Sequence, residues 1–194
     1  SYGATSLPSV KKGMFTMKKE AAYSCALCIL LVLCTSCGSS KNAAMQVADN
    51  SFTMTPQAYI DYLNRAAENY MDDGLVQIPN YTESGQKIEI DTGFDLTLTT
   101  DDDGNLTGIE WSWFSSRSND MNSSFYLGVA LGMVIPDQDG IEQTAQELKL
   151  LEDIQSDFEC YSSYGDVAFA HSMYTSITND NVQFHFVDIL PLKD

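Results

Sequence analysis

The sequence predicts an α+β fold in which helices pack on one face of an antiparallel β-sheet. Segments with apolar residues at helical spacing alternate along the chain with segments in which every second residue is apolar. The period-two segments come in pairs joined by turns rich in Asp, Asn and Gly, which is typical of hairpins and therefore of antiparallel strands. The predicted order is helix, hairpin, helices, hairpin, in a single globular domain over residues 52–194.

The first helix is predicted to start at Thr55 and Pro56, because a capping hydroxyl followed by proline is typical of a helix start. Its apolar residues recur at helical spacing to about Met71. Gly74 and Pro79 follow and end the helical pattern.

The first hairpin is predicted around residues 101–105, Asp-Asp-Asp-Gly-Asn, which favour a tight turn. Apolar and polar residues alternate on both sides of it. Trp111 and Trp113 share a face with Ile109, and we expect this face to be sheet core beneath the helices. The alternative is that this face is exposed to solvent and that both tryptophans stack on a sugar ring or on a loop of a partner. Three tyrosines would join them there: Tyr161, Tyr164 and Tyr174.

The second half begins with an almost wholly apolar stretch over residues 125–135, which predicts a buried helix that Pro136 ends. A turn over 137–140 leads into another helix. Its inward residues are expected to be Ile141, Ala145, Leu148, Leu151 and Ile154. Two strands complete the pattern, over about 165–177 and 181–189.

Composition supports a globular domain and excludes one class of partner. Of the 194 residues, 44% are hydrophobic, and two Trp, ten Tyr and nine Phe are too many aromatic residues for a disordered chain. Ten Lys and Arg stand against 27 Asp and Glu, a net charge of −17. Because phosphate binding needs clustered cations, nucleic acid is not expected as a partner.

The N-terminal part has the pattern of an export signal. Met17 and two lysines precede an apolar run over residues 21–33, which is shorter than the roughly 20 residues that span a bilayer. Residues 34–40 then read Cys-Thr-Ser-Cys-Gly-Ser-Ser. This segment resembles the signal of bacterial lipoproteins, in which small residues precede an acylated cysteine.

The resemblance implies transfer of diacylglycerol to the Cys37 thiol and cleavage of the bond between Ser36 and Cys37. Cys34 is the alternative acceptor, but bulky Leu33 precedes it where the family has a small residue. A lipid at Cys37 implies a location on the outer leaflet of the cell membrane or on the outer membrane.

The sequence therefore divides into four segments. Residues 1–16 lie ahead of the Met-Lys-Lys start of the signal, and we expect them to be upstream translation that is not native sequence. Residues 17–36 are the expected signal peptide, 37–51 the lipidated cysteine with a flexible tether, and 52–194 the folded domain. From Cys37 onward, six Lys and Arg stand against 26 Asp and Glu, so the exported part carries a net charge of −20.

A calcium-binding loop is the strongest motif-like match, over residues 99–110. It puts oxygen-bearing side chains at positions 1, 3 and 5 of an EF-hand loop, glycine at 6 and glutamate at 12. A weak Ca²⁺ site built on Asp101, Asp103 and Glu110 is therefore one hypothesis. Because Thr99 replaces the first aspartate and strands flank the loop, a plain hairpin turn is the main expectation.

Cys160, with Asp166 and His171 nearby, suggests a nucleophile and a base. No Gly-rich elbow surrounds Cys160, and a free cysteine is commonly a small buried hydrophobe, so no catalytic residue is assigned. His171 falls in an apolar alternation and is expected in the core, whereas His185 is expected to be exposed. Two histidines and one non-lipidated cysteine without ligand spacing argue against a zinc site.

Two functions remain open. The first is a non-enzymatic binding or interaction module, tethered to the membrane by its lipid, whose acidic exterior selects a cationic protein, another envelope partner or metal ions. The second is a small cell-envelope hydrolase with paired carboxylates such as Asp91 and Glu110, which we expect on adjacent strands. Because the sequence shows no nucleophile, metal or phosphate motif, the first is favoured.

Overall fold

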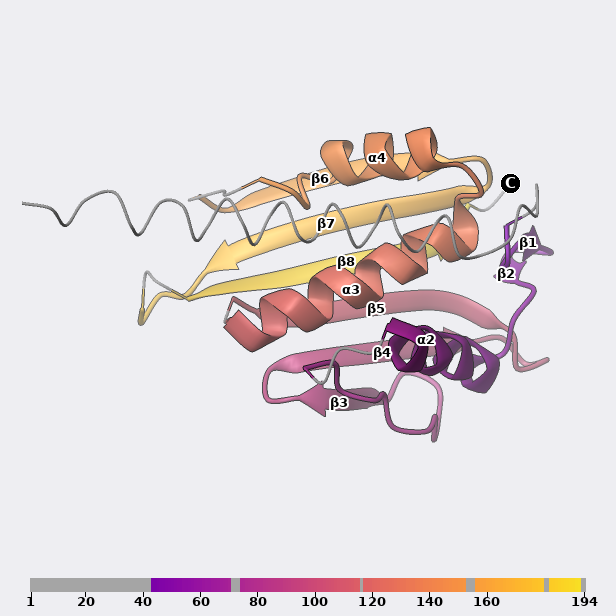
Figure 1. Cartoon of the computed structure of the whole chain (residues 1–194). Helices are drawn as coiled ribbons and strands as arrows, with labels where there is room; N and C mark the ends of the chain where they lie inside the picture. The colour runs from indigo at the N-terminus through magenta and orange to yellow at the C-terminus, as the bar shows by residue number, and fades with distance from the viewer. Residues whose placement is uncertain (1–42, 71–73, 116, 153–155, 180–181, 193–194) are drawn as a thin grey trace, which may run out of the picture.

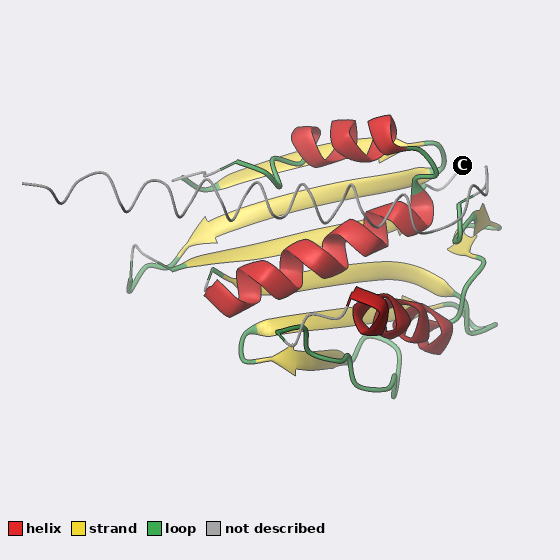
Figure 2. Cartoon of the chain, viewed as in Figure 1, coloured by secondary structure: helices red, strands yellow, loops and turns green. Residues whose placement is uncertain are grey.

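The computed structural model describes residues 43–70, 74–115, 117–152, 156–179 and 182–192. In this part of the chain, helices and an antiparallel sheet form two layers, so the predicted α+β class is confirmed. The helices are α2 (Pro56–Tyr70), α3 (Arg117–Val134) and α4 (Gln138–Glu147). Figures 1 and 2 show all three on the same face of the sheet, as expected.

The sheet consists of two three-stranded meanders joined at their last strands. The first comprises β3 (Lys87–Asp91), β4 (Phe94–Thr100) and β5 (Leu106–Phe114). The second comprises β6 (Phe158–Tyr164), β7 (Val167–Thr175) and β8 (Gln183–Pro191). The strand order is β3-β4-β5-β8-β7-β6, and every neighbouring pair is antiparallel. Each predicted hairpin therefore has one further strand, β3 or β6, which forms an edge of the sheet.

Capping side chains start two of the helices where the sequence indicates. Thr55 Oγ1 accepts the N–H of Ala58 at 3.4 Å, and Pro56 is the first residue of α2. Asp137 Oδ1 accepts the N–H of Gly140 at 2.7 Å at the start of α4. Because α4 ends at Glu147, the buried Leu148 and the half-buried Leu151 lie beyond the helix, and Ile154 falls outside the described residues.

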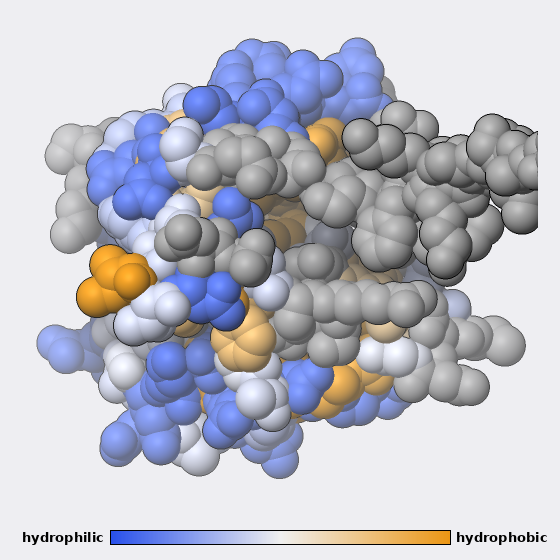
Figure 3. All heavy atoms as spheres, turned by 90° about the vertical axis from the view of Figure 1, so that its left-hand side faces the viewer, coloured by the Kyte–Doolittle hydropathy of each residue, from blue (hydrophilic) through white to orange (hydrophobic). Residues whose placement is uncertain are grey.

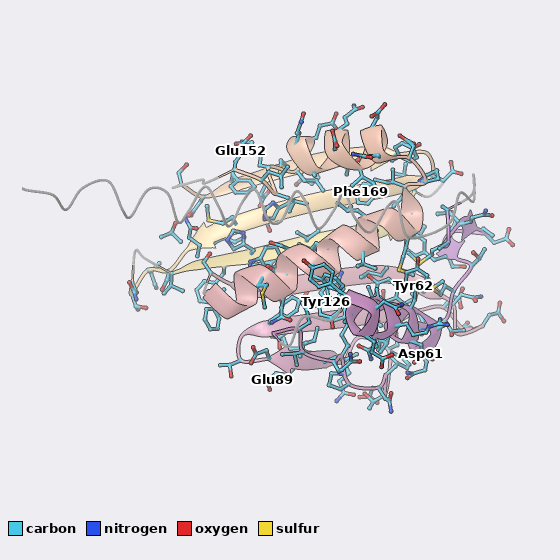
Figure 4. The ribbon with its side chains drawn as sticks, viewed as in Figure 1. Asp61, Tyr62, Glu89, Tyr126, Glu152 and Phe169 are labelled. Atoms are coloured by element: carbon cyan, nitrogen blue, oxygen red, sulfur yellow. The ribbon has the colours of Figure 1, made fainter. Side chains whose placement is uncertain are left out.

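The core lies between the helices and the face of the sheet that they cover. Trp111 is fully buried and stacks on Phe94 and Tyr126, with ring centroids 5.6 and 5.9 Å apart. Tyr126 comes from α3, so this stack joins a helix to the sheet (Figure 4). Trp113 is 8% exposed on the same face, and the prediction that both tryptophans belong to the core is confirmed.

The packed structure begins earlier in the chain than the sequence indicates. Met45 is 1% exposed, and its N–H donates to the carbonyl of Met133 at 2.8 Å. Two short strands, β1 (Val47–Ala48) and β2 (Ser51–Phe52), then pair with each other. The segment predicted as a tether over 37–51 therefore contributes to the fold from residue 45. A lone methionine among small and polar residues has no periodic pattern that would reveal this.

The predicted signal segment and Cys37 lie outside the described residues. Within the described part of the chain, none of the helices combines the length and the apolar character needed to cross a membrane.

Candidate functional site

One face of the sheet is left uncovered by the described helices. Trp111 and Val187 are fully buried on the covered face. Because successive side chains of a strand point to opposite faces, their neighbours Glu110 and Asp188 lie on the other face. Glu89, at the edge of the sheet in Figure 4, lies on this second face as well.

Cross-strand pairing aligns the residues of this uncovered face in rows. The first row is Lys87, Thr97, Glu110, Asp188, Ala170 and Tyr161. The second row is Glu89, Asp95, Ser112, Phe186, Ser172 and Glu159. A shorter third row is Phe114, Phe184 and Tyr174. We call the residues of these three rows the open face.

The open face combines carboxylates with aromatic rings. Its carboxylates are Glu89, Asp95, Glu110, Asp188 and Glu159. Within the three rows the cation is Lys87, whose Nζ lies 2.9 Å from Asp95 Oδ2. Among its aromatic side chains, Tyr161 is 71% exposed and Tyr174 and Phe184 are each 41% exposed. Exposed aromatic residues are enriched where proteins bind one another, so these aromatic side chains are typical of an interface.

The carboxylates of Glu110 and Asp188 come from residues directly opposite each other on β5 and β8. Partial burial, and next the charge of Glu110, raise the pKa of Asp188. Two like charges on directly opposite residues of neighbouring strands destabilise a sheet unless a cation binds between them. The predicted pair of Asp91 and Glu110 is not formed on adjacent strands, because β4 lies between β3 and β5.

The three predicted calcium ligands are not brought together. Asp101 Oδ1 accepts the N–H groups of Asp103 at 3.0 Å and Asn105 at 2.8 Å, which closes the turn and lowers the pKa of Asp101. Glu110 lies instead on the open face, opposite Asp188. The expected β-hairpin is confirmed by the pairing of β4 with β5. No group of three or more His, Cys, Asp and Glu within the described ranges is arranged to hold a metal ion.

A second polar cluster lies beneath the helices, on the covered face. His171 Nδ1 lies 2.7 Å from the carbonyl oxygen of Leu148, and its Nε2 lies 3.2 Å from Nδ1 of His185. His185 Nε2 lies 3.0 Å from Ser115 Oγ. Trp113 stacks on His185 with ring centroids 4.8 Å apart. His171 is 3% exposed, as expected for a core histidine.

These hydrogen bonds are all satisfied by one pair of tautomers. The carbonyl of Leu148 only accepts, so the neutral His171 carries its proton on Nδ1 and accepts at Nε2. His185 then donates from Nδ1 and accepts the Ser115 hydroxyl at Nε2. Burial lowers the pKa of both histidines, that of His185 to about 4. Because a base with this pKa is weak at neutral pH, we interpret the cluster as a satisfied core network.

The prediction that His185 is exposed is wrong. Phe184 and Phe186 alternate with it, and these two aromatic residues lie on the open face, so His185 points inward. The alternation in the sequence separates the two faces of the strand but does not say which face is covered.

The three tyrosines singled out in the sequence lie on both faces of the sheet. Tyr161 and Tyr174 lie on the open face, whereas the hydroxyl of Tyr164 donates to Asp137 on the helix side.

Cys160, Asp166 and His171 do not form a catalytic set. The Cys160 thiol donates to the backbone carbonyl of His171 at 3.6 Å and not to its ring. Burial raises the pKa of the thiol, which disfavours the reactive thiolate. Asp166 lies in the turn between β6 and β7, and its carbonyl accepts the N–H of Leu192.

A small cavity lies between α3, α4 and the sheet. Its volume is about 50 Å³, and Trp113, Leu127, Leu131 and Leu150 are among the mainly apolar side chains that line it. Pockets for drug-sized ligands measure about 300–1,000 Å³. The cavity is therefore too small for such a ligand, and the open face is the larger candidate for recognition.

At one end of the molecule, the surface of the described residues is mainly hydrophilic. Figure 3 looks onto the end of the molecule where β7 connects to β8 and shows mostly hydrophilic residues with one prominent hydrophobic projection. Ile177, in this connection, is 99% exposed.

Comparisons of this chain with protein-family models, curated proteins and solved structures found no match.

Proposed function

We propose that the protein is an exported, membrane-tethered binding module that binds a positively charged protein through its open face. The observation that carries this proposal is the combination of five carboxylates with exposed aromatic side chains on the face that the helices leave uncovered. Aromatic side chains supply buried contact area on binding, and carboxylates supply specificity for cations.

The size of the open face supports a protein as partner. Six strands about 4.8 Å apart, each contributing about seven residues at about 3.3 Å, give the whole uncovered side of the sheet roughly 600 Å², and the open face is part of it. A standard interface buries about 800 Å² on each partner. The uncovered side of the sheet, together with the residues around it, is therefore of the size that a stable protein complex uses.

The charge of the open face supports a cationic partner over a second copy of this chain. A second copy would bring the same carboxylates, and the chain from Cys37 onward has a net charge of −20. A surface rich in Lys and Arg would neutralise Glu110 and Asp188, which now lie opposite each other.

The proposed location follows from the resemblance of residues 17–40 to a lipoprotein signal. A diacylglycerol on Cys37 would hold the domain at the membrane through the few residues that precede Met45. Membrane tethering raises the local concentration of the domain near an envelope partner.

Site-specific photo-cross-linking in the producing cells tests the binding function. A photoreactive residue replaces Ser172 on the open face or, as a control, the exposed Gln143 on α4. We expect covalent adducts with an envelope protein from position 172 that diminish when Glu110 and Asp188 are both changed to Lys. Adducts from position 143 alone, or equal adducts from both positions, would contradict the proposal.

A further inference from the structure

Glu159, on the edge strand β6, is held between two tyrosines of the open face. The hydroxyl of Tyr174 donates to Glu159 Oε1 at 2.6 Å, and that of Tyr161 donates to Oε2 at 3.3 Å. The charge of Glu159 raises the pKa of Tyr161, and the hydrogen bond to Glu159 raises the pKa of Tyr174, so both stay protonated donors at neutral pH. The carboxylate is therefore oriented before any partner arrives.

A third ring extends this arrangement toward the centre of the sheet. Phe186 on β8 packs against Tyr174 with ring centroids 6.3 Å apart and an angle of 60° between the rings. On β7, Ser172 lies between Glu159 and Phe186, and Ala170 lies beside Tyr161. Both have short side chains. We call Glu159, Tyr161, Tyr174 and Phe186 the Glu159 cluster.

We propose that the Glu159 cluster binds the guanidinium group of an arginine side chain of the protein partner. The proposal rests on the function proposed above and names the side chain that the open face recognises. The guanidinium lies against the exposed ring of Tyr161 and donates to the outward lone pairs of Glu159. The alkyl part of the arginine lies over Ala170 and Ser172.

The chemistry of the cluster favours arginine over lysine. A carboxylate offers about four lone-pair positions, and the two tyrosine hydroxyls occupy one on each oxygen. The two that remain can accept the paired N–H groups of a guanidinium. A guanidinium is also planar and weakly hydrated, so it stacks on an aromatic ring at a lower desolvation cost than an ammonium group.

Within the three rows of the open face, no cationic side chain occupies the position proposed for the arginine. Lys87 is the cation of the three rows, and it lies on β3, at the opposite edge of the sheet, where it pairs with Asp95. An arginine from outside therefore adds the positive charge that the β6 side of the face lacks.

Nuclear magnetic resonance with defined peptides tests the proposal. The full-length protein in a neutral detergent, with ring-labelled tyrosine, is titrated with Ac-Gly-Gly-Arg-Gly-Gly-NH₂ in 0.15 M NaCl. Peptides with lysine or with neutral citrulline in place of arginine are the matched ligands. We expect saturable shifts of the Tyr161 and Tyr174 ring signals in the millimolar range, with tighter binding of the arginine than of the lysine peptide and no binding of citrulline.

Two variants distinguish binding of the arginine peptide at the Glu159 cluster from its nonspecific attraction to an acidic protein. Glu159→Gln keeps an oxygen that accepts from the tyrosines but removes the charge, and we expect about fivefold weaker binding of the arginine peptide. Glu142→Gln on α4 removes a carboxylate from the helix side and should leave the affinity unchanged. Equal losses in both variants, or equal binding of the citrulline peptide, would overturn the proposal.

The outcomes also separate this site from the proposed function. Cross-links from position 172 together with an unresponsive Glu159 cluster would overturn the arginine site while the binding face stands. Saturable arginine binding that Glu159→Gln weakens supports the site whether or not cross-links form, and missing cross-links would count against the binding function alone.

Discussion

Glu110 and Asp188 lie directly opposite each other at the junction of the two three-stranded halves of the sheet. Their neighbours on either side, Thr97 and Ala170, carry no charge. Folding alone therefore brings two carboxylates together at the centre of an exposed face. A cation supplied by a partner would remove the repulsion, and this supports the proposal that the open face binds a cationic partner.

Two buried tyrosines should respond to loss of their hydroxyl groups with opposite signs. Among the described residues, the buried hydroxyl of Tyr59 faces Trp111 without a well-formed hydrogen bond, whereas that of Tyr126 donates to the carbonyl of Val76 at 2.6 Å. We expect Tyr59→Phe to raise the free energy of unfolding by up to about 1 kcal/mol and Tyr126→Phe to lower it by about 1 kcal/mol. Urea unfolding measures both, and the same sign for the two variants would contradict this difference.

Acidification should destabilise the protein through its buried histidines. Their pKa values in the folded state are lowered from 6.5, that of His185 to about 4, so the unfolded chain binds more protons between these values. This contribution to stability is complete above about pH 6.5 and is lost as the pH falls toward 4. For His185 it amounts to at most about 3 kcal/mol at 1.36 kcal/mol per pH unit.

His185→Phe isolates this contribution from that of the carboxylates. The variant keeps a ring on Trp113 but cannot bind a proton, so its unfolding free energy should fall less between pH 7 and pH 4.5. Urea unfolding at the two pH values measures the difference. Equal losses in the variant and the parent protein would show that His185 does not titrate in this range.

The fold class was predictable because it depends on local patterns. Thr55 and Asp137 cap helices as their positions indicate, and residues 101–105 form the expected turn. Asp91, at the end of β3, was expected on a strand, but β3 was not separated from the first hairpin, and the edge strand β6 was missed. The strand β6 has few apolar residues, so its alternation is weak; it reads Phe-Glu-Cys-Tyr-Ser-Ser-Tyr.

The candidate site could be predicted only in part. The acidic character is evident from composition, but the pairing of Glu110 with Asp188 depends on how two meanders separated by two helices meet. Periodicity does not contain that long-range register. For the same reason, the sequence could not show that Phe186 lies outward and His185 inward.

Met45 should stabilise the domain although it lies in the segment predicted as a tether. It is 1% exposed, and removing a buried methionine side chain leaves a cavity. We expect Met45→Ala to lower the free energy of unfolding by about 2–5 kcal/mol. The half-buried Met54 supplies the control, with a smaller loss for Met54→Ala in the same urea titration. No measurable loss for Met45→Ala would show that residues before 52 do not contribute to the core.

Cys37→Ser should abolish lipid attachment and move the protein out of the membrane fraction. The reason is the small-residue sequence before Cys37, which resembles the cleavage site of a lipoprotein signal. Labelled palmitate and cell fractionation measure both effects, with Cys34→Ser as the control that stays lipidated. Label lost in Cys34→Ser and retained in Cys37→Ser would identify Cys34 as the acceptor.

Carboxyl footprinting tests most directly whether the open face is the binding face. A carbodiimide couples glycine ethyl ester to accessible carboxylates, and mass spectrometry compares the protein in intact cells with the purified protein. We expect Glu89, Glu110 and Glu159 to be protected in cells, while Asp139 and Glu142 on α4 are labelled equally in both samples. Protection of the α4 carboxylates, with full labelling of the open face, would contradict the assignment.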